Sequence, residues 1–205
     1  INNLFATVIN EFEFVADDNF LKTIKDEKLK QNTGLEFFYQ SIDNNLQNRK
    51  EYKNLSNKIL ETTKEICDLY HYEYDSIEIT NMWLNVSKDK TYHFPHTHSN
   101  NNFAGVWYPF DQHSPLIFID PRIQKNVWVP RLKNNSHLTA SQVAFTNKKN
   151  MGLIFPAWLQ HYVPPANVSR TSISWNVLIR GEYGEQNTLQ NSNNTNGKKK
   201  GNTKG

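Results

Sequence analysis

The sequence predicts a mainly β protein with an α-helical layer, built as one domain. Three observations support this prediction: a series of short apolar runs follows residue 76, a helical pattern precedes it, and polar turn residues separate the runs. At 205 residues the chain is long enough for one domain with a substantial core, and two domains are not expected.

The N-terminal part, about residues 17–72, is expected to be helical. Its clearest segment is EYKNLSNKILETTKEICDLYHY, residues 51–72. Apolar side chains recur there at helical spacing: Tyr52, Leu55, Ile59, Ile66 and Leu69. Such a stripe needs a partner layer, and a sheet is the partner we expect. An apolar run at residues 3–15 is expected to form an early strand.

The part from about residue 76 to 180 is expected to be a β core. Runs rich in Ile, Val, Phe and Trp cover residues 76–86, 103–110, 115–120, 126–130, 141–145, 151–156 and 170–179. The segment FTNKKNMG, residues 145–152, is typical of a hairpin loop. Many short strands at such spacing favour a sandwich or barrel over a βαβ fold.

The composition, the net charge and the C-terminal residues limit the kinds of partner and site that the chain is expected to have. Residues 1–182 are expected to form the single domain, and residues 183–205 a polar, disordered tail. Net charge is only +3, and the last eight residues carry four of the 23 basic side chains, so a nucleic-acid partner is not expected. No run is long enough to span a membrane, so no membrane partner is expected. A single cysteine, Cys67, excludes an intrachain disulfide and a cysteine-based zinc site, and a cytoplasmic location is the default. Nothing in the sequence indicates an oligomeric state.

Three of the seven histidines lie within HFPHTH, residues 93–98. His96 and His98 are two residues apart, so on a strand both would point to one face and could bind one metal ion. The alternative is that they are ordinary polar residues at a strand end. His93 would point to the opposite face of such a strand and is expected to line the entrance.

A second stretch, residues 155–180, contains His161 and, nine residues later, Arg170, which opens an apolar strand. Alternation places four polar side chains on one face of that strand: Arg170, Ser172, Ser174 and Asn176. If this face lines a cavity, Arg170 offers paired N–H donors to a carboxylate, and Ser172 adds a hydroxyl. Otherwise it is an exposed sheet face with a surface ion pair.

Four segments occur in the order found in iron(II)- and 2-oxoglutarate-dependent (2OG-Fe(II)) oxygenases: MWLN (82–85), HTHSNNNFAGVWY (96–108), IDPR (119–122) and FPAWLQHYVPPANVSRTSISWN (155–176). Over roughly residues 76–180 the chain resembles the family of these enzymes that is related to prolyl hydroxylases. The resemblance implies a double-stranded β-helix, a cupin-like jelly-roll that holds iron between its two sheets. It also implies O₂-dependent hydroxylation, with 2-oxoglutarate converted to succinate and CO₂.

The resemblance assigns roles to particular residues. His96 and His161 would bind iron, and His98 occupies the position usually held by Asp or Glu. Arg170 would bind the far carboxylate of 2-oxoglutarate, assisted by Ser172 or Ser174. Further pocket residues are Trp83 and Asn85 beside the cosubstrate, and His93, Tyr108, Trp158 and Asn176 around it. Asp120 is an alternative third ligand, but we expect it to pair with Arg122 outside the metal site.

Two other functions compete with the oxygenase: a three-histidine metal enzyme on a cupin-like barrel without 2-oxoglutarate, and a non-catalytic jelly-roll binding module. Arg170 separates them, because only the oxygenase needs this cation deep in the pocket near the metal. The substrate is unidentified. A peptide or protein side chain is preferred over a small molecule, on the likeness to prolyl hydroxylases.

Overall fold

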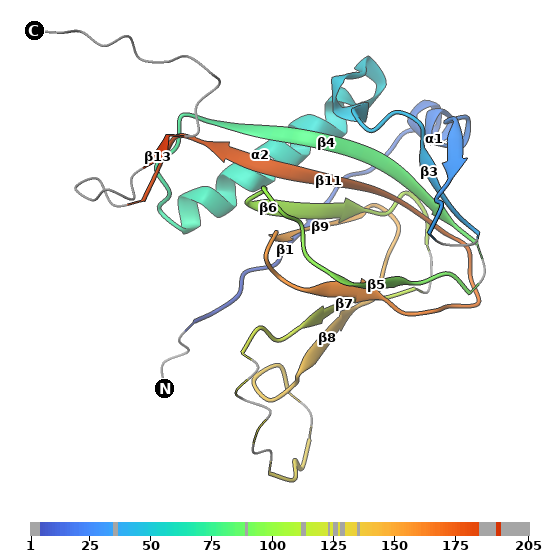
Figure 1. The fold of residues 1–205 in the computed structure, drawn as a ribbon. Coiled ribbons are helices and arrows are strands. Elements are labelled where there is room, and N and C mark those ends of the chain that lie inside the picture. Colours follow the sequence, from blue (N-terminus) through green and yellow to red (C-terminus); the bar gives the residue numbers. More distant parts are fainter. Residues whose placement is uncertain are drawn as a thin grey trace, which may run out of the picture.

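Two antiparallel β-sheets face each other in this computed structural model, and helices cover the outer face of the larger sheet (Figure 1). The structure describes residues 5–34, 37–88, 90–111, 114–122, 124, 127, 130–134, 136–184 and 192–193. The seven-stranded sheet has the order β1 (Asn10–Glu13), β9 (Met151–Pro156), β6 (Phe103–Trp107), β11 (Arg170–Arg180), β4 (Ser76–Ser87), β3 (Phe38–Ser41) and β2 (Leu29–Gln31). The four-stranded sheet has the order β5 (His93–His96), β10 (His161–Val163), β7 (Leu116–Ile119) and β8 (Gln142–Phe145). This arrangement confirms the predicted mainly β fold with a double-stranded β-helix core.

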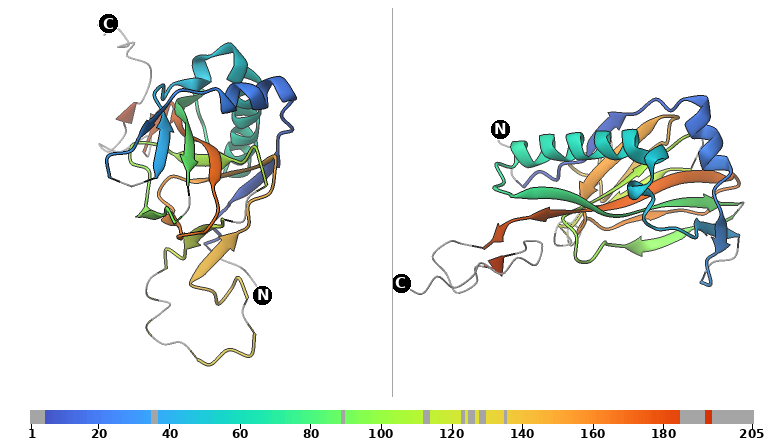
Figure 2. Two further views of the ribbon diagram at one scale, coloured as in Figure 1. Left: turned by 90° about the vertical axis from the view of Figure 1, so that its right-hand side faces the viewer. Right: turned by 90° about the horizontal axis from the view of Figure 1, so that it is seen from above.

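The helical layer consists of α1 (Asp18–Lys25), α2 (Lys53–Leu69) and two 3₁₀ turns, Leu46–Asn48 and Lys50–Tyr52. Helix α1 begins at Asp17, whose carboxylate accepts a hydrogen bond from the Phe20 N–H at 2.8 Å. Helix α2 runs alongside β4 on the outer face of the seven-stranded sheet (Figure 2). Its predicted stripe is largely buried there, except for Leu69, which is exposed at the C-terminal end.

The core has two parts, one on each side of the seven-stranded sheet. The part beneath the helices includes Leu55, Ile59, Met82, Ile173 and Trp175. The part between the two sheets consists of Ala104, Val106, Tyr108, Leu116, Phe118, Met151, Leu153, Phe155, Leu159 and Val163. Strand β11 supplies apolar side chains to the first part, and its other face looks into the space between the sheets.

The expectation of helices throughout residues 17–72 is wrong for residues 29–41. Strands β2 and β3 form a hairpin there and extend the large sheet beyond β4, with Phe38 opposite Ser87. All three residues of β2 are exposed, so no apolar alternation marks this edge strand in the sequence. The early strand is also shorter than expected, since β1 covers only Asn10–Glu13.

One other local expectation needs correction. The segment 146–150 does not close a hairpin, because β8 and β9 lie in different sheets and the segment crosses between them. At the start of the expected tail, β12 (Glu182–Tyr183) pairs with β13 (Ser192–Asn193). Apart from residues 192–193, the tail from residue 185 on lies outside the described residues, as does most of the run 126–130.

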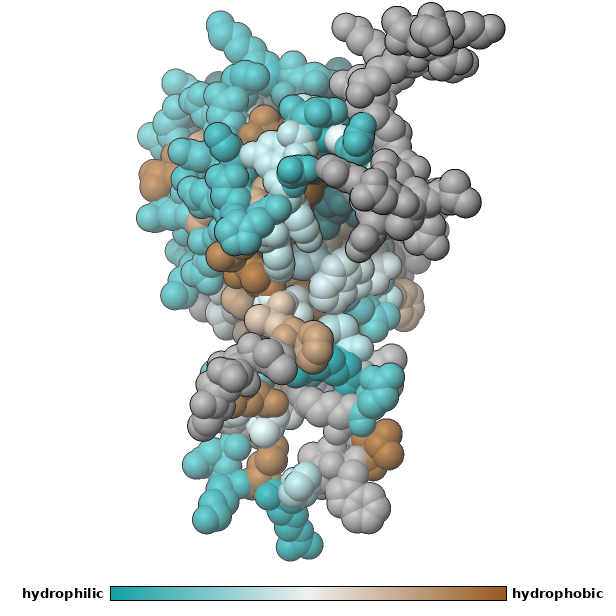
Figure 3. Space-filling model, turned by 90° about the vertical axis from the view of Figure 1, so that its left-hand side faces the viewer, coloured by the Kyte–Doolittle hydropathy of each residue, from teal (hydrophilic) through white to brown (hydrophobic). Residues whose placement is uncertain are grey.

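The surface is mainly hydrophilic over the upper part of the face shown in Figure 3, in keeping with a chain rich in Asn and Lys. Within the described residues, no helix is both long enough and apolar enough to cross a membrane.

Candidate active site

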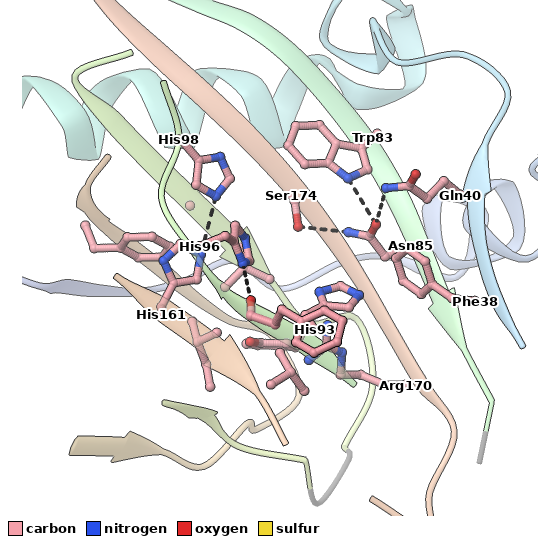
Figure 4. A pocket seen from close by; sticks show the side chains of 17 residues that line it. Phe38, Gln40, Trp83, Asn85, His93, His96, His98, His161, Arg170 and Ser174 are labelled. Atoms are coloured by element: carbon pink, nitrogen blue, oxygen red, sulfur yellow. Dashed lines mark hydrogen bonds between the residues drawn. The ribbon is translucent and has the colours of Figure 1, made fainter. Parts of the chain in front are cut away.

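Three histidines meet where β5 and β10 lie side by side. His96 ends β5 and stands opposite His161, the first residue of β10. His98 follows two residues later, and its backbone N–H donates to the Ala157 carbonyl at 2.9 Å, which holds the loop against the turn before β10. The nearest ring nitrogens of the three side chains all lie within 4.8 Å of one another (Figure 4).

Backbone carbonyls fix the tautomers of two of these rings. Nδ1 of His161 lies 2.9 Å from the Leu159 carbonyl oxygen, and Nδ1 of His96 lies 2.7 Å from that of Phe94. A carbonyl only accepts, so each Nδ1 carries the hydrogen and each Nε2 presents a lone pair. Nε2 of His98 and Nε2 of His161 are 3.3 Å apart. A cation between such nitrogens would stabilise them, so this donor set fits Fe(II).

Burial keeps His161 and His98 in the form that binds a metal. Burial lowers the pKa of His161 to about 3 with smaller contributions from the neighbouring His96 and His98, against the hydrogen bond to Leu159. The pKa of His98 is also lowered, first by burial and then by His96, although a hydrogen bond with Asn176 opposes this. Neutral imidazole is the metal-binding state, so protons do not compete for these two sites near neutral pH.

His93 lies on the same side as His96, not on the opposite face as expected. Three residue steps of β5, from His96 back to His93, lie opposite only two steps of β10, from His161 to Val163. This bulge adds one residue and reverses the alternation of side chains. The rings of His93 and Phe38 pack in a T-shaped arrangement with their centroids 4.5 Å apart. The Nε2 atom of His93 is buried with no partner among the described residues. Burial, followed by the charge of Arg170, lowers the pKa of His93 to about 3.

The polar face of β11 is buried, which overturns the alternative of an exposed face with a surface ion pair. Arg170 is 6% exposed, and its Nη1 has no hydrogen-bond partner in the described part of the chain. Ser172 is fully buried, and its Oγ is likewise unpaired. Burial lowers the pKa of Arg170, while Tyr108 beside it acts in the opposite direction. A buried cation with free donors is costly unless an anion binds it, so this end of the strand fits a carboxylate.

One cavity of about 310 Å³ contains both features (Figure 4). It is lined by Phe38, Gln40, Trp83, Asn85, His93, Phe94, His96, His98, Gly105, Val106, Tyr108, Leu116, Phe155, His161, Val163, Arg170 and Ser174. The structure thus brings together most of the residues that the sequence singled out.

Three of the predicted pocket residues do not line this cavity. Ser172 and Asn176 share a face of β11 with Arg170 but do not line the cavity. The Asn176 amide N–H donates to the side chain of Asn81 at 2.9 Å. The prediction for Trp158 is wrong, because its side chain is 57% exposed on the turn before β10. Asp120 binds Arg122 at 2.9 Å and borders a different cavity.

The sequence did not predict the contribution of β3. Phe38 and Gln40 line the cavity from the hairpin that was expected to be helical. The apolar lining residues, such as Val106 and Phe155, belong to runs that look like ordinary core in the sequence. Only their position between the two sheets makes them pocket walls.

A double-stranded β-helix with a histidine cluster and a buried arginine in one cavity is the arrangement that the resemblance to 2-oxoglutarate-dependent, non-haem iron oxygenases implies. Residues 81–176 match the model of the family described as "Putative 2OG-Fe(II) oxygenase". This part of the chain is therefore a 2OG-Fe(II) oxygenase domain, and the predicted family and enzyme class are confirmed. Its cofactors are Fe(II), 2-oxoglutarate and O₂.

Solved structures share the fold at low sequence identity. A 2OG-Fe(II) oxygenase family oxidoreductase from Burkholderia pseudomallei aligns with a TM-score of 0.58 at 9% identity, covering 83% of this chain and 84% of that one. HygX from Streptomyces hygroscopicus, with nickel and 2-oxoglutarate bound, has a TM-score of 0.58 at 8% identity, covering 83% and 82%. A Pseudomonas putida prolyl-4-hydroxylase has a TM-score of 0.58 at 8% identity, covering 85% and 95%. No curated protein matches the sequence.

Proposed function

We propose that this oxygenase hydroxylates a peptide or protein side chain, with iron held by His96, His98 and His161. The observation that supports these ligands is the convergence of their ring nitrogens within 4.8 Å in a cavity that also holds Arg170. The substrate preference comes from the likeness in fold to prolyl hydroxylases. A single domain over residues 1–182 and a cytoplasmic location complete the proposal.

Each side chain has a physical task. Arg170 binds the far carboxylate of 2-oxoglutarate, with Ser172 as the neighbouring hydroxyl donor, and so fixes the register of the cosubstrate. Trp83 and Asn85 form the adjoining wall. Tyr108 remains a neutral phenol, because burial raises its pKa to about 12 against the opposing charge of Arg170. When bound, iron and 2-oxoglutarate supply the oxidant from O₂, with release of succinate and CO₂.

The three-histidine set differs from the usual two histidines and one carboxylate in charge. All three ligands are neutral, so the site keeps one more positive charge than a site with an acidic ligand. The site should therefore attract an anionic cosubstrate at least as strongly. The buried, unpaired Arg170 supports the oxygenase over both a cupin-like enzyme without cosubstrate and a binding module, since neither needs this cation.

Anaerobic titration of the metal-free protein with Fe(II) and 2-oxoglutarate tests this proposal. We expect a weak visible charge-transfer band that requires both additions and is lost in His161→Ala. The band should form only at much higher 2-oxoglutarate concentration in Arg170→Leu. Iron binding without the band would favour the cupin-like enzyme. No iron binding would favour the non-catalytic module.

A further inference from the structure

The wall of the cavity formed by β3, β4 and β11 is a chain of hydrogen bonds with a fixed direction (Figure 4). The Trp83 indole N–H donates to Asn85 Oδ1 at 3.0 Å, and Gln40 Nε2 donates to the same oxygen at 3.1 Å. Asn85 Nδ2 then donates to the Ser174 hydroxyl oxygen at 2.9 Å. An indole N–H can only donate, so it sets which atom of the Asn85 amide is the oxygen.

The far end of this chain is fixed in the same way. The backbone N–H of Gly34 donates to Asn32 Oδ1 at 3.0 Å, and Asn32 Nδ2 donates to Gln40 Oε1 at 3.1 Å. A backbone N–H is also only a donor, so both ends impose the same orientation on Gln40. The direction of every hydrogen bond in this chain is therefore set by the two end groups, Trp83 and the Gly34 backbone, which can only donate.

This wall still has hydrogen-bond donors to offer a ligand. Both lone pairs of Asn85 Oδ1 are used, and Ser174 accepts from Asn85, so the Ser174 hydroxyl has its own hydrogen to give. Asn85 and Gln40 each keep a second N–H. Hydrogen bonds in such a chain polarise one another, which strengthens the donor at its end.

The charges of the residues that line the cavity also favour an anionic ligand. None of the 17 described residues that line it is Asp or Glu, and Arg170 is the only Arg or Lys among them. With three neutral ligands, Fe(II) keeps both of its positive charges, and Arg170 adds a third. 2-Oxoglutarate cancels two of the three. One positive charge then remains in a largely buried site, where an uncompensated charge is costly.

We propose that the substrate presents a carboxylate to the wall formed by Gln40, Asn85 and Ser174, and that cationic substrates are excluded. This inference rests on the proposed function, because the charge balance includes bound iron and 2-oxoglutarate. A carboxylate supplies the acceptors that the free donors need and cancels the remaining charge. Two sources share this chemistry: an acidic side chain of a peptide and a small free acid.

The test measures binding to the wild-type protein loaded with Co(II) in place of Fe(II) and saturated with 2-oxoglutarate. Isothermal titration compares glutamate, glutamine and lysine, each N-acetylated and carried as the N-methylamide, so that only side-chain charge and shape differ. L-Malate represents the free acids. We expect the capped glutamate or malate to bind at least about tenfold more tightly than the capped glutamine, with no binding of the lysine. Preference for the capped glutamate indicates a peptide side chain, and preference for malate a small acid.

Two charge variants show whether the preference comes from the site. His98→Asp restores an acidic ligand, and Gln40→Glu adds a carboxylate to the wall. Each should reduce the preference for the acid over the glutamine to about one. Gln40→Leu is the matched control: it removes the Gln40 donors without adding charge and should lower the preference clearly less than Gln40→Glu does.

The outcomes separate the two proposals. If 2-oxoglutarate does not bind the Co(II) protein, the proposed function fails and this inference fails with it. If 2-oxoglutarate binds but the capped glutamine binds as well as either acid, only this inference is overturned. It is also overturned if chloride at about 0.1 M abolishes acid binding, because a small inorganic anion then balances the charge.

Discussion

The two faces of strand β11 are both buried, yet they serve different purposes. One face carries Ile173, Trp175 and Val177 into the core beneath α2. The other carries Arg170 and Ser172, and on each of these a buried donor lacks a partner among the described residues. On the apolar face the exception is the indole N–H of Trp175.

This difference shows how a single strand can provide both stability and a binding site. Apart from the Trp175 indole N–H, the apolar face is fully packed in the protein alone, because its side chains lie in the core beneath helix α2. The polar face is incomplete, because buried donors without partners cost free energy that a bound anion would recover. Substitutions on the first face should therefore lower stability, and substitutions on the second should lower ligand affinity.

The largest expected effect is on the apolar face. Trp175→Ala should lower the free energy of unfolding by about 3–5 kcal/mol, because the side chain is fully buried and its loss leaves a cavity. Urea denaturation measures this change. Trp158→Ala, at an exposed site, should change stability by less than about 0.5 kcal/mol. Equal losses in the two variants would contradict the assignment of Trp175 to the core.

On the polar face, Arg170→Leu should lower ligand affinity without lowering stability. The affinity for 2-oxoglutarate in the presence of Fe(II), measured anaerobically, should fall by about 100-fold or more, because the cosubstrate loses its charged partner. The free energy of unfolding should stay the same or rise by about 1–2 kcal/mol, because an unpaired buried charge is removed.

Arg180 provides the matched control on the same strand, since it is paired with Glu78 at 2.6 Å. Arg180→Leu should leave 2-oxoglutarate affinity unchanged and lower stability by about 1 kcal/mol at most. An unchanged affinity in Arg170→Leu would show that the cosubstrate does not bind on this face of β11.

Acidification should destabilise the metal-free protein through His93 and His161, which line the same cavity as Arg170. His93 and His161 have an ordinary pKa of 6.5 and a pKa of about 3 in the folded state, so the unfolded chain binds more protons between these values. Stability is then greatest above pH 6.5 and falls as pH decreases towards 3. At pH 5 the loss should be on the order of 2 kcal/mol per histidine.

Urea denaturation at pH 7 and at pH 5 measures this loss, and His93→Phe should reduce it by about half. A free energy of unfolding that does not change between these pH values would show that the two rings are not held neutral by burial.

The smallest expected effect is at Ser172. Ser172→Ala removes a buried hydroxyl that has no partner, so the free energy of unfolding should rise by up to about 1 kcal/mol. The affinity for 2-oxoglutarate should fall only a few-fold, because Arg170 remains. A clear loss of stability would indicate that the hydroxyl already has a structural partner, which would weaken the contrast between the two faces.

The sequence predicted the parts of this site that depend on local alternation. Residues 172–177 alternate polar and apolar side chains without interruption, so both faces of β11 could be assigned before the fold was known. The spacing of His96 and His98, together with the resemblance, correctly predicted that these side chains and His161 come together.

The missing parts depend on tertiary structure. The position of His93 depends on a bulge between β5 and β10, and a bulge has no sequence pattern of its own here. The hairpin that carries Phe38 and Gln40 is stabilised by pairing with β4 across some 45 residues, and the exposed β2 gives no periodic signal. Whether a polar strand face is exposed or lines a cavity depends on the second sheet, which local pattern does not reveal.

A crystal structure of the protein with Ni(II) and 2-oxoglutarate would test the central claim most directly. The account predicts anomalous density for nickel among the Nε2 atoms of His96, His98 and His161, and a cosubstrate carboxylate on Arg170. Nickel bound elsewhere, or a cosubstrate that leaves Arg170 unpaired, would contradict it.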